Sequence, residues 1–263
     1  MIMDAMIDVE NLTIKFGGVT AVNNVSFHLG KGEVLGVIGP NGSGKTTLFN
    51  LLSGIYKPTF GTIRLNGKTI SGLSADTVFN CGISRTFQNG RLFWKMNVLE
   101  NIMIGISSVR HTMPFASLLP GFKAKKLEEE AIDKAYSIMQ IFGDLLTSQS
   151  DKLAKELPYA DRRRLEICRA IASEPKVLLL DEPSAGMDNL ETEKLMEDLL
   201  KVKKARPDLT MIVVEHDMGF IKGLVDKVMV LNYGNNIAFG LFDDVAHDDA
   251  VITAYLGRDE KDA

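Results

Sequence analysis

A glycine-rich loop that ends in a lysine and a threonine is the first group of residues here that could do chemistry. It extends from Gly39 to Thr46, reads GPNGSGKT, and follows the apolar run Val34 to Ile38. Glycines let backbone N–H groups curl around phosphate oxygens, and a helix that begins at such a loop adds positive potential. An accidental match is expected in about one per cent of chains of this length. The pattern therefore predicts a phosphate-binding site formed by Asn41, Gly42, Ser43, Gly44, Lys45, Thr46 and Thr47.

Two roles follow from the residue types in this loop. Lys45 is expected to contact the β and γ phosphates of a nucleoside triphosphate, and the Thr46 hydroxyl is expected to bind Mg²⁺.

Two adjacent carboxylates, Asp181 and Glu182, follow a second apolar run, Val177 to Leu180. The carboxyl end of a parallel strand lies where open α/β sheets bind ligands. Asp181 then has the position of a Mg²⁺ ligand, and Glu182 could accept a proton from an attacking water. An Asp-Glu pair after a strand is common, so it is strong evidence only together with the phosphate loop.

A parallel sheet is needed to bring these groups together, and the sequence predicts one. Apolar runs predict strands, and helix-like stretches such as Leu190 to Ala205 separate the later ones, which indicates crossover helices in an α/β fold. The strands are predicted at Ile7 to Phe16, Ala21 to Leu29, Val34 to Ile38, Val177 to Leu180, Thr210 to Val214 and Lys227 to Leu231. The first two are joined by a turn at Gly17-Gly18, and a helix should extend from near Gly44 through Leu52.

Composition limits the kinds of protein that the chain can be. Its 263 residues are 45% hydrophobic and 24% charged, which allows one large α/β domain or a core with an inserted lobe. The net charge of −4 gives no general attraction to nucleic acid. No apolar run approaches the roughly 18 residues of a membrane span, and Met1 to Glu10 has no signal-like pattern, so we expect a cytosolic location. Cys81 and Cys168 lack metal-ligand spacing and are expected to be reduced packing residues.

Further motifs, in the same order along the chain, resemble those of the ABC ATPase family. Gln88 matches the Q-loop glutamine, which in that family joins Mg²⁺ and the nucleophilic water to a helical lobe. His216, just after the strand Thr210 to Val214, resembles the switch histidine that contacts the γ phosphate and supports the glutamate. A surface glutamine and a packing histidine are the structural alternatives.

Two more positions match the same family. Phe16 resembles the aromatic residue that stacks on adenine, with a core phenylalanine as the alternative. Asp188 has the place of the D-loop aspartate. The resemblance implies an ABC ATPase fold: a P-loop NTPase (RecA-like) core with an antiparallel β subdomain and an inserted α-helical subdomain. It predicts a single nucleotide-binding domain over 1–263, with 1–88 and 174–263 as core and β subdomain and 89–173 as the helical subdomain.

The signature segment departs from the family pattern. The usual Leu-Ser-Gly-Gly-Gln is replaced by Leu157-Pro158-Tyr159-Ala160-Asp161. Proline is acceptable in the first turn of a helix, but the serine hydroxyl is lost and Ala160 adds a methyl group where glycine allows close approach. The resemblance still places Pro158, Tyr159 and Ala160 against nucleotide on a second subunit.

The resemblance narrows to the LivG-type ATPases of branched-chain amino acid uptake. It rests on five features of the sequence: Phe16-Gly17-Gly18, Ala21 to Val25, Arg85 to Gln88 with Arg91 to Phe93, the long middle insertion and the ending Ala254 to Gly257. It implies ATP and Mg²⁺ as ligands, with Lys45, Gln88, Glu182 and His216 as catalytic residues.

The implied partners are a second, identical or paralogous ATPase subunit, membrane permease subunits and, indirectly, a solute-binding protein. The exposed-looking Phe93, Trp94 and Met96 would suit the permease, with packing of the helical lobe as the alternative. Urea or amide uptake and lipopolysaccharide export are alternative transport functions. ATPases of DNA repair or translation are the alternative class. The first need a long coiled coil between two halves and usually a basic surface, the second need two domains in one chain, and the sequence shows neither feature.

Overall fold

The computed structural model describes residues 5–87, 91–106 and 121–256. Its backbone forms two compact units. The first contains residues 1–83, 176–182 and 208–263, and the second contains 84–175 and 183–207. The subdomain boundaries expected at 88 and 174 stay a prediction.

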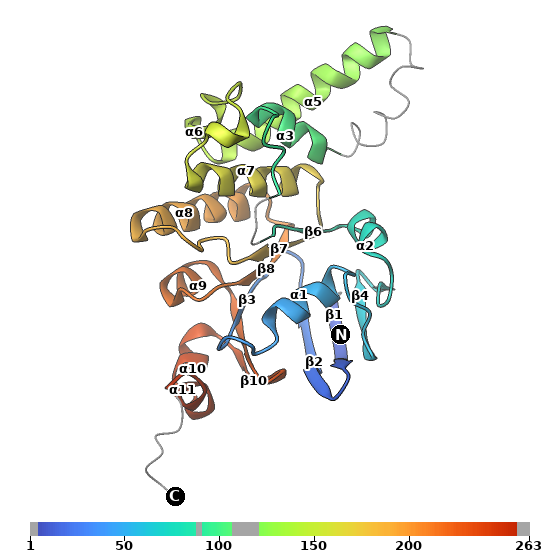
Figure 1. Ribbon diagram of the computed structural model, residues 1–263, viewed down its shortest axis with the longest axis vertical. Helices are drawn as coiled ribbons and strands as arrows, with labels where there is room; N and C mark the ends of the chain where they lie inside the picture. Colours follow the sequence, from blue (N-terminus) through green and yellow to red (C-terminus); the bar gives the residue numbers. More distant parts are fainter. Residues whose placement is uncertain (1–4, 88–90, 107–120, 257–263) are drawn as a thin grey trace, which may run out of the picture. The chain divides into compact units, whose positions relative to one another are not determined.

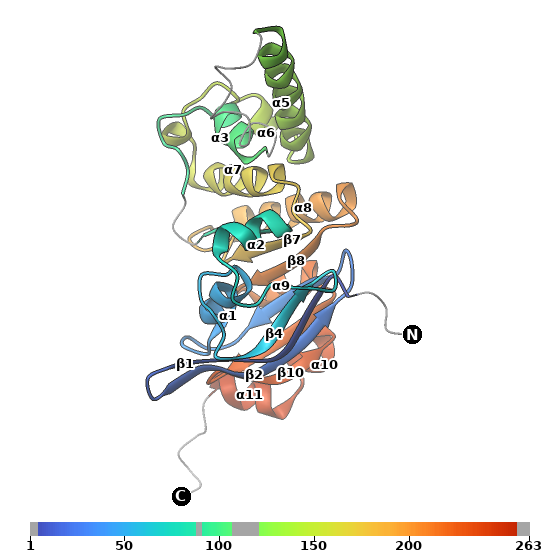
Figure 2. The same cartoon turned by 90° about the vertical axis from the view of Figure 1, so that its right-hand side faces the viewer.

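The first unit contains two sheets (Figures 1 and 2). The antiparallel sheet has the order β2-β1-β4-β5 and is formed by Val19–Leu29, Ile7–Phe16, Phe60–Leu65 and Lys68–Thr69. The other sheet has the order β10-β9-β3-β8-β7-β6. Its strands are β10 (Asn235–Gly240), β9 (Lys227–Asn232), β3 (Val34–Ile38), β8 (Thr210–Val214), β7 (Val177–Asp181) and β6 (Ile83–Arg85), where the chain passes into the second unit.

Strand pairing confirms the predicted parallel sheet. β3 pairs in parallel with β8 and β9, and β7 pairs in parallel with β8. Every residue of β3, β7 and β8 is buried, as expected for strands covered on both faces. The predicted hairpin is also present, because β1 pairs with β2 in antiparallel fashion from Ile7 and Leu29 to Phe16 and Val19.

Short helices complete the first unit. They are α1 (Lys45–Leu52), α2 (Ala75–Cys81), α9 (Met218–Leu224), α10 (Phe242–Ala246) and α11 (Asp249–Leu256). Figure 1 shows α10 and α11, in red, next to β10, which both helices contact. The sequence predicted α1 to within one residue, since the glycine-rich loop marks its start and Gly54 lies just beyond its end.

The second unit is helical. Its helices are α3 (Val98–Gly105), α5 (Gly121–Ile141), α6 (Asp144–Thr147), the 3₁₀ turn Ala154–Glu156, α7 (Tyr159–Ala172) and α8 (Asn189–Ala205). α7 contacts α3, α5, α6 and α8 (Figure 2). Capping boxes start two of these helices, Asn97 with Glu100 at α3 and Asp188 with Glu191 at α8. None of the helices in the described parts of the chain is long and apolar enough to cross a membrane.

The two cysteines are free, as predicted. Cys168 is fully buried in α7, and burial raises the pKa of its thiol well above the usual value.

A buried ion-pair network joins α7 to α8. Arg164 Nε lies 2.7 Å from Asp198 Oδ2, and Arg164 Nη1 lies 3.1 Å from Asp161 Oδ1. All three side chains are less than 10% exposed. Lys201 reaches Asp198 from the surface, at 2.8 Å.

Arg164→Met should therefore lower the free energy of unfolding by about 3 kcal/mol, because two buried carboxylates lose their main cation. Lys201→Met is the matched control and should cost less than about 1 kcal/mol, since Lys201 is half exposed. Chemical denaturation of both variants measures the difference. Equal losses of unfolding free energy in the two variants would show that the buried ion pairs of Arg164 contribute no more to stability than the exposed pair of Lys201.

Candidate functional site: a nucleotide-binding loop

The phosphate loop connects the end of β3 to the start of α1 and lies tightly on neighbouring backbone. A Cβ on Gly39, whose φ is +146°, would lie 2.1 Å from the Leu231 carbonyl oxygen. A Cβ on Gly44, whose φ is +107°, would lie 2.5 Å from the Ala21 carbonyl oxygen. Glycine is thus required at both positions for steric and conformational reasons. No side chain caps the N-terminus of α1, so its first N–H groups need another acceptor, such as an anion bound at the loop.

Lys45 is buried and holds the loop in its curled form. Its Nζ donates hydrogen bonds to the carbonyls of Gly39, at 2.7 Å, and Pro40, at 3.0 Å. Burial lowers the pKa of Lys45, while attraction from Glu182 and Asp181 opposes that shift. A cation that is held in this way lies where it can also donate to phosphate oxygens.

Ser43 supports the same interpretation. Its side-chain oxygen is buried and, within the part of the chain that the structure describes, has no hydrogen-bond partner. A buried hydroxyl is normally satisfied, and a bound phosphate oxygen would satisfy this one. The loop therefore fits a polyphosphate ligand.

A pocket of about 320 Å³ opens above the loop. Asn41 to Thr47 line it together with Glu182 and residues from β2 and the β9–β10 turn. Those additional lining residues are Val19, Thr20, Ala21, Tyr233 and Gly234. The sequence does not predict these residues, because nothing local in β2 or in the Tyr233-Gly234 turn indicates that either segment faces a loop so distant in sequence.

The acid pair lies at the end of β7, as predicted. Asp181 is its last residue and is buried. Glu182 has a φ of +47°, unusual for a residue other than glycine, and its N–H donates to the Val214 carbonyl of β8 at 2.9 Å. This hydrogen bond holds Glu182 in a backbone conformation that it would otherwise avoid.

The structure brings Glu182 together with His216. Their side chains come from the ends of β7 and β8, and His216 Nε2 lies 2.9 Å from Glu182 Oε1. The His216 backbone N–H donates to the buried Glu215 carboxylate at 3.0 Å, and the ring is half exposed. The arrangement gives a carboxylate oriented by an imidazole at the edge of the phosphate pocket.

Three other residues were predicted to contact the nucleotide or Mg²⁺, namely Phe16, Thr46 and Gln88. Phe16, at the end of β1, is 46% exposed and makes an edge contact with Tyr56, 5.3 Å between ring centroids, so it is not a core phenylalanine. Thr46 is exposed at the pocket. Gln88 lies outside the described residues.

The signature segment and Asp188 belong to the second unit. Pro158 is the N-cap of α7, and Pro158 and Tyr159 are exposed. Ala160 is buried, as is Asp161, which pairs with Arg164. Asp188 is the exposed N-cap residue of α8.

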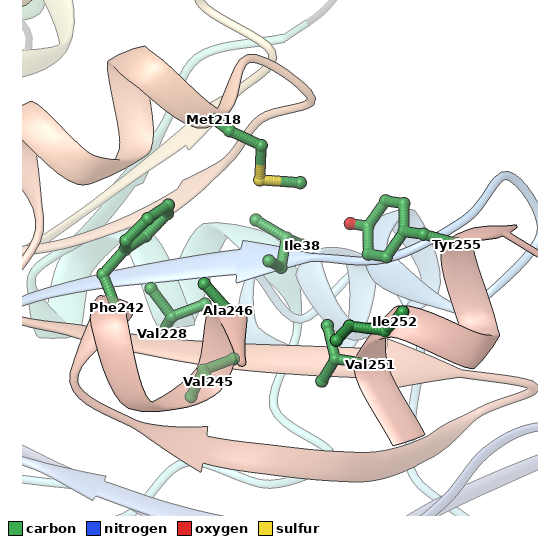
Figure 3. Close-up of a pocket in the computed structure, with 9 residues that line it drawn as sticks. All are labelled: Ile38, Met218, Val228, Phe242, Val245, Ala246, Val251, Ile252 and Tyr255. Carbon is green, nitrogen blue, oxygen red and sulfur yellow. The ribbon is translucent and has the colours of Figure 1, made fainter. Parts of the chain in front are cut away.

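Helix α11 lies next to the start of the phosphate loop. Tyr255 of α11 lies beside Ile38, which precedes Gly39 directly (Figure 3). Burial raises the pKa of Tyr255, and a hydrogen bond with the backbone of Gly39 acts in the opposite direction. An apolar pocket of about 380 Å³ separates these residues from Phe242 of α10 and from Met218, two residues after His216.

Comparison with known proteins agrees with this site. The sequence matches the ABC transporter family over residues 22–185, which include the phosphate loop and the acid pair. The chain belongs to the ABC transporter family. This ABC transporter protein is also 39% identical over 253 residues to the high-affinity branched-chain amino acid transport ATP-binding protein LivG of Salmonella typhimurium, an alignment that covers 96% of this chain and 98% of LivG.

Other relatives give the same result. The ABC transporter protein is 37% identical to the branched-chain amino acid transport ATP-binding protein BraF of Pseudomonas aeruginosa, with 96% and 98% of the two chains covered. Its fold resembles the crystal structure of the ADP conformation of MJ1267, an ATP-binding cassette of an ABC transporter. That match has a TM-score of 0.82 and 30% identity, and it covers 96% of this chain and 99% of the other. The predicted family and fold are confirmed.

Gly44→Ala should weaken nucleotide binding by at least about tenfold, because its Cβ would collide with the Ala21 carbonyl. Gly67→Ala is the matched control: Gly67 also has a left-handed φ, of +73°, but has nothing within 4 Å of the added Cβ. Titration with a fluorescent ATP analogue compares the two. Unchanged affinity in Gly44→Ala would contradict the close approach of the loop to β2.

Proposed function

We propose that this protein is the ATP-binding and ATP-hydrolysing subunit that powers an ABC importer for branched-chain amino acids. The observation that carries the proposal is the pairing of Glu182 with His216, 2.9 Å apart, at the edge of a pocket formed by a phosphate loop. The names of the relatives LivG and BraF support the choice of solute.

The residues in and beside this pocket have different roles in the proposed hydrolysis. Lys45 and the loop N–H groups bind the phosphates and neutralise charge on the group that is transferred. Glu182 accepts a proton from the attacking water, and His216 orients the glutamate and contacts the γ phosphate.

A Mg²⁺ ion, when bound, stabilises negative charge on the phosphates. Thr46, Asp181 and Gln88 are the residues proposed to hold it. No group of three or more His, Cys, Asp or Glu side chains suited to a metal occurs in the described residues. Mg²⁺ is usually held by one or two carboxylates together with substrate phosphates and water.

The remaining site residues are proposed to complete binding in a dimer. Phe16 is exposed and is proposed to stack on adenine. The start of α7 in one subunit, where Pro158 and Tyr159 are exposed and Ala160 is buried beneath them, is proposed to face the nucleotide held by the other. Asp188 lies in the same interface. The second subunit is an identical or a paralogous chain, and ATP binding closes the pair.

A surface of the second unit is proposed to receive the membrane permease. Phe93 and Trp94 are 46% and 43% exposed, and the guanidinium groups of Arg169 and Arg162 lie over their rings at 5.7 and 5.5 Å. Exposed aromatic residues beside arginine are typical of interface hot spots. The protein would thus act on the cytoplasmic face of the membrane, with a solute-binding protein as an indirect partner.

The loop that carries these aromatic residues is well fixed. The buried Asn101 side chain accepts from the Phe93 N–H and donates to the carbonyls of Phe93, Met96 and Asn97. The backbone that carries the aromatic rings is therefore fixed before a partner binds, which reduces the conformational entropy that would be lost on binding.

Glu182→Gln should lower ATP turnover by about 100-fold or more with little change in ATP affinity, because only the proton acceptor is lost. Lys45→Ala should instead abolish nucleotide binding. Steady-state ATPase assays and nucleotide titrations of the two variants test this division of roles. Parental turnover in Glu182→Gln would require another base.

Trp94→Ala should reduce co-purification with the permease subunits while ATP affinity stays at the parental value, because Trp94 does not line the phosphate pocket. Phe239→Ala is the control, since Phe239 is an exposed aromatic residue, at 38%, on β10 of the other unit. Pull-down from membranes containing the co-expressed permease measures both. Full recovery of the complex with Trp94→Ala would exclude this surface.

A further inference from the structure

Tyr159 stands where the family signature has a small residue, and its side chain is fixed from two sides. Its hydroxyl donates to the Ala185 carbonyl at 2.8 Å and accepts from Arg163 Nη2 at 3.0 Å. The Arg163 guanidinium also lies over the Tyr159 ring, at 5.4 Å. The hydroxyl therefore uses both its donor and an acceptor site within the second unit.

The segment that Tyr159 reaches is the one that leads into α8. Gly186 has a left-handed φ of +81°, and a Cβ at that position would lie 3.4 Å from the Tyr159 hydroxyl. Two residues later, Asp188 caps α8 through its capping box with Glu191. Tyr159, the first residue of α7, thus connects the start of that helix to the turn that precedes α8.

Arg163 extends this link to a third segment. Its Nη1 donates to the Phe87 carbonyl at 3.1 Å and to the Glu166 carboxylate at 3.1 Å. Arg163 and Glu166 are both buried, so the guanidinium is held in one place. Phe87 directly precedes Gln88, a proposed Mg²⁺ and water contact.

Three segments with proposed roles in hydrolysis therefore meet at one tyrosine–arginine pair. They are the residues before Gln88, the signature segment, and the turn before Asp188. The glycine that the family pattern has at this position has no side chain that could make this connection.

We propose that Tyr159 is a positioning residue. It couples the start of α7 to the turn at Ala185-Gly186 and, through Arg163, to the chain before Gln88. The three segments then move together when ATP is bound and cleaved. This inference rests on the proposed ATPase function. A merely structural Tyr159 would affect stability and leave turnover unchanged.

Tyr159→Phe tests the coupling, because it removes only the hydroxyl and keeps the ring beneath Arg163. We expect kcat for ATP to fall at least about fivefold, since small misplacements of reacting groups are costly, with KM within about twofold of the parental value. Tyr136→Phe is the matched control: Tyr136 also belongs to the second unit and donates through its hydroxyl, to Ser150 Oγ at 3.3 Å. That variant should keep parental kcat.

Denaturation midpoints show whether both variants are equally well folded. Parental kcat in Tyr159→Phe would overturn the coupling and leave the ATPase proposal intact. An equal fall in both variants would also overturn it, because the effect would then be a general loosening of the second unit. If the parental chain itself has no ATPase activity, the proposed function fails, and the coupling fails with it.

Discussion

The close approach of the phosphate loop to two strands is the constraint on which the site depends. Gly39 lies against the carbonyl of Leu231 in β9, and Gly44 lies against the carbonyl of Ala21 in β2. With no room for a Cβ at these two positions, neighbouring backbone limits the conformation of the loop. The buried Lys45 ammonium then holds the loop from within by donating to the Gly39 and Pro40 carbonyls.

The carboxylate side of the pocket is fixed by the parallel sheet. β7 and β8 pair in register up to Asp181 and Val214, so the residues that follow them leave the sheet at the same edge. The Val214 carbonyl holds the Glu182 N–H, and the left-handed turn there directs Glu182 toward His216. A backbone conformation that costs about 1–3 kcal/mol is thereby maintained at a residue that lines the phosphate pocket.

The second unit is organised by buried arginines rather than by an apolar core alone. Arg164 joins α7 to α8 through Asp161 and Asp198, and the neighbouring Arg163 joins Tyr159, Glu166 and the Phe87 carbonyl. Buried charges of this kind are costly unless each is paired, so they specify the packing of this helical unit closely. The segments proposed to contact nucleotide are attached to that network.

Local pattern alone determined the phosphate loop, the acid pair and the strands Val34–Ile38 and Thr210–Val214, because each depends on residue types at fixed short spacing. It also predicted the parallel arrangement, since crossover helices separate the later strands. It could not determine that Tyr233 and Ala21 line the pocket, because these residues lie far from the loop in sequence. The contact between His216 and Glu182 was predicted only by the resemblance to the ABC ATPase family, since local pattern says nothing about residues 34 positions apart. Likewise, Asp161 follows Tyr159 closely in sequence, yet only tertiary packing decided that it is buried against Arg164 while Tyr159 reaches Ala185.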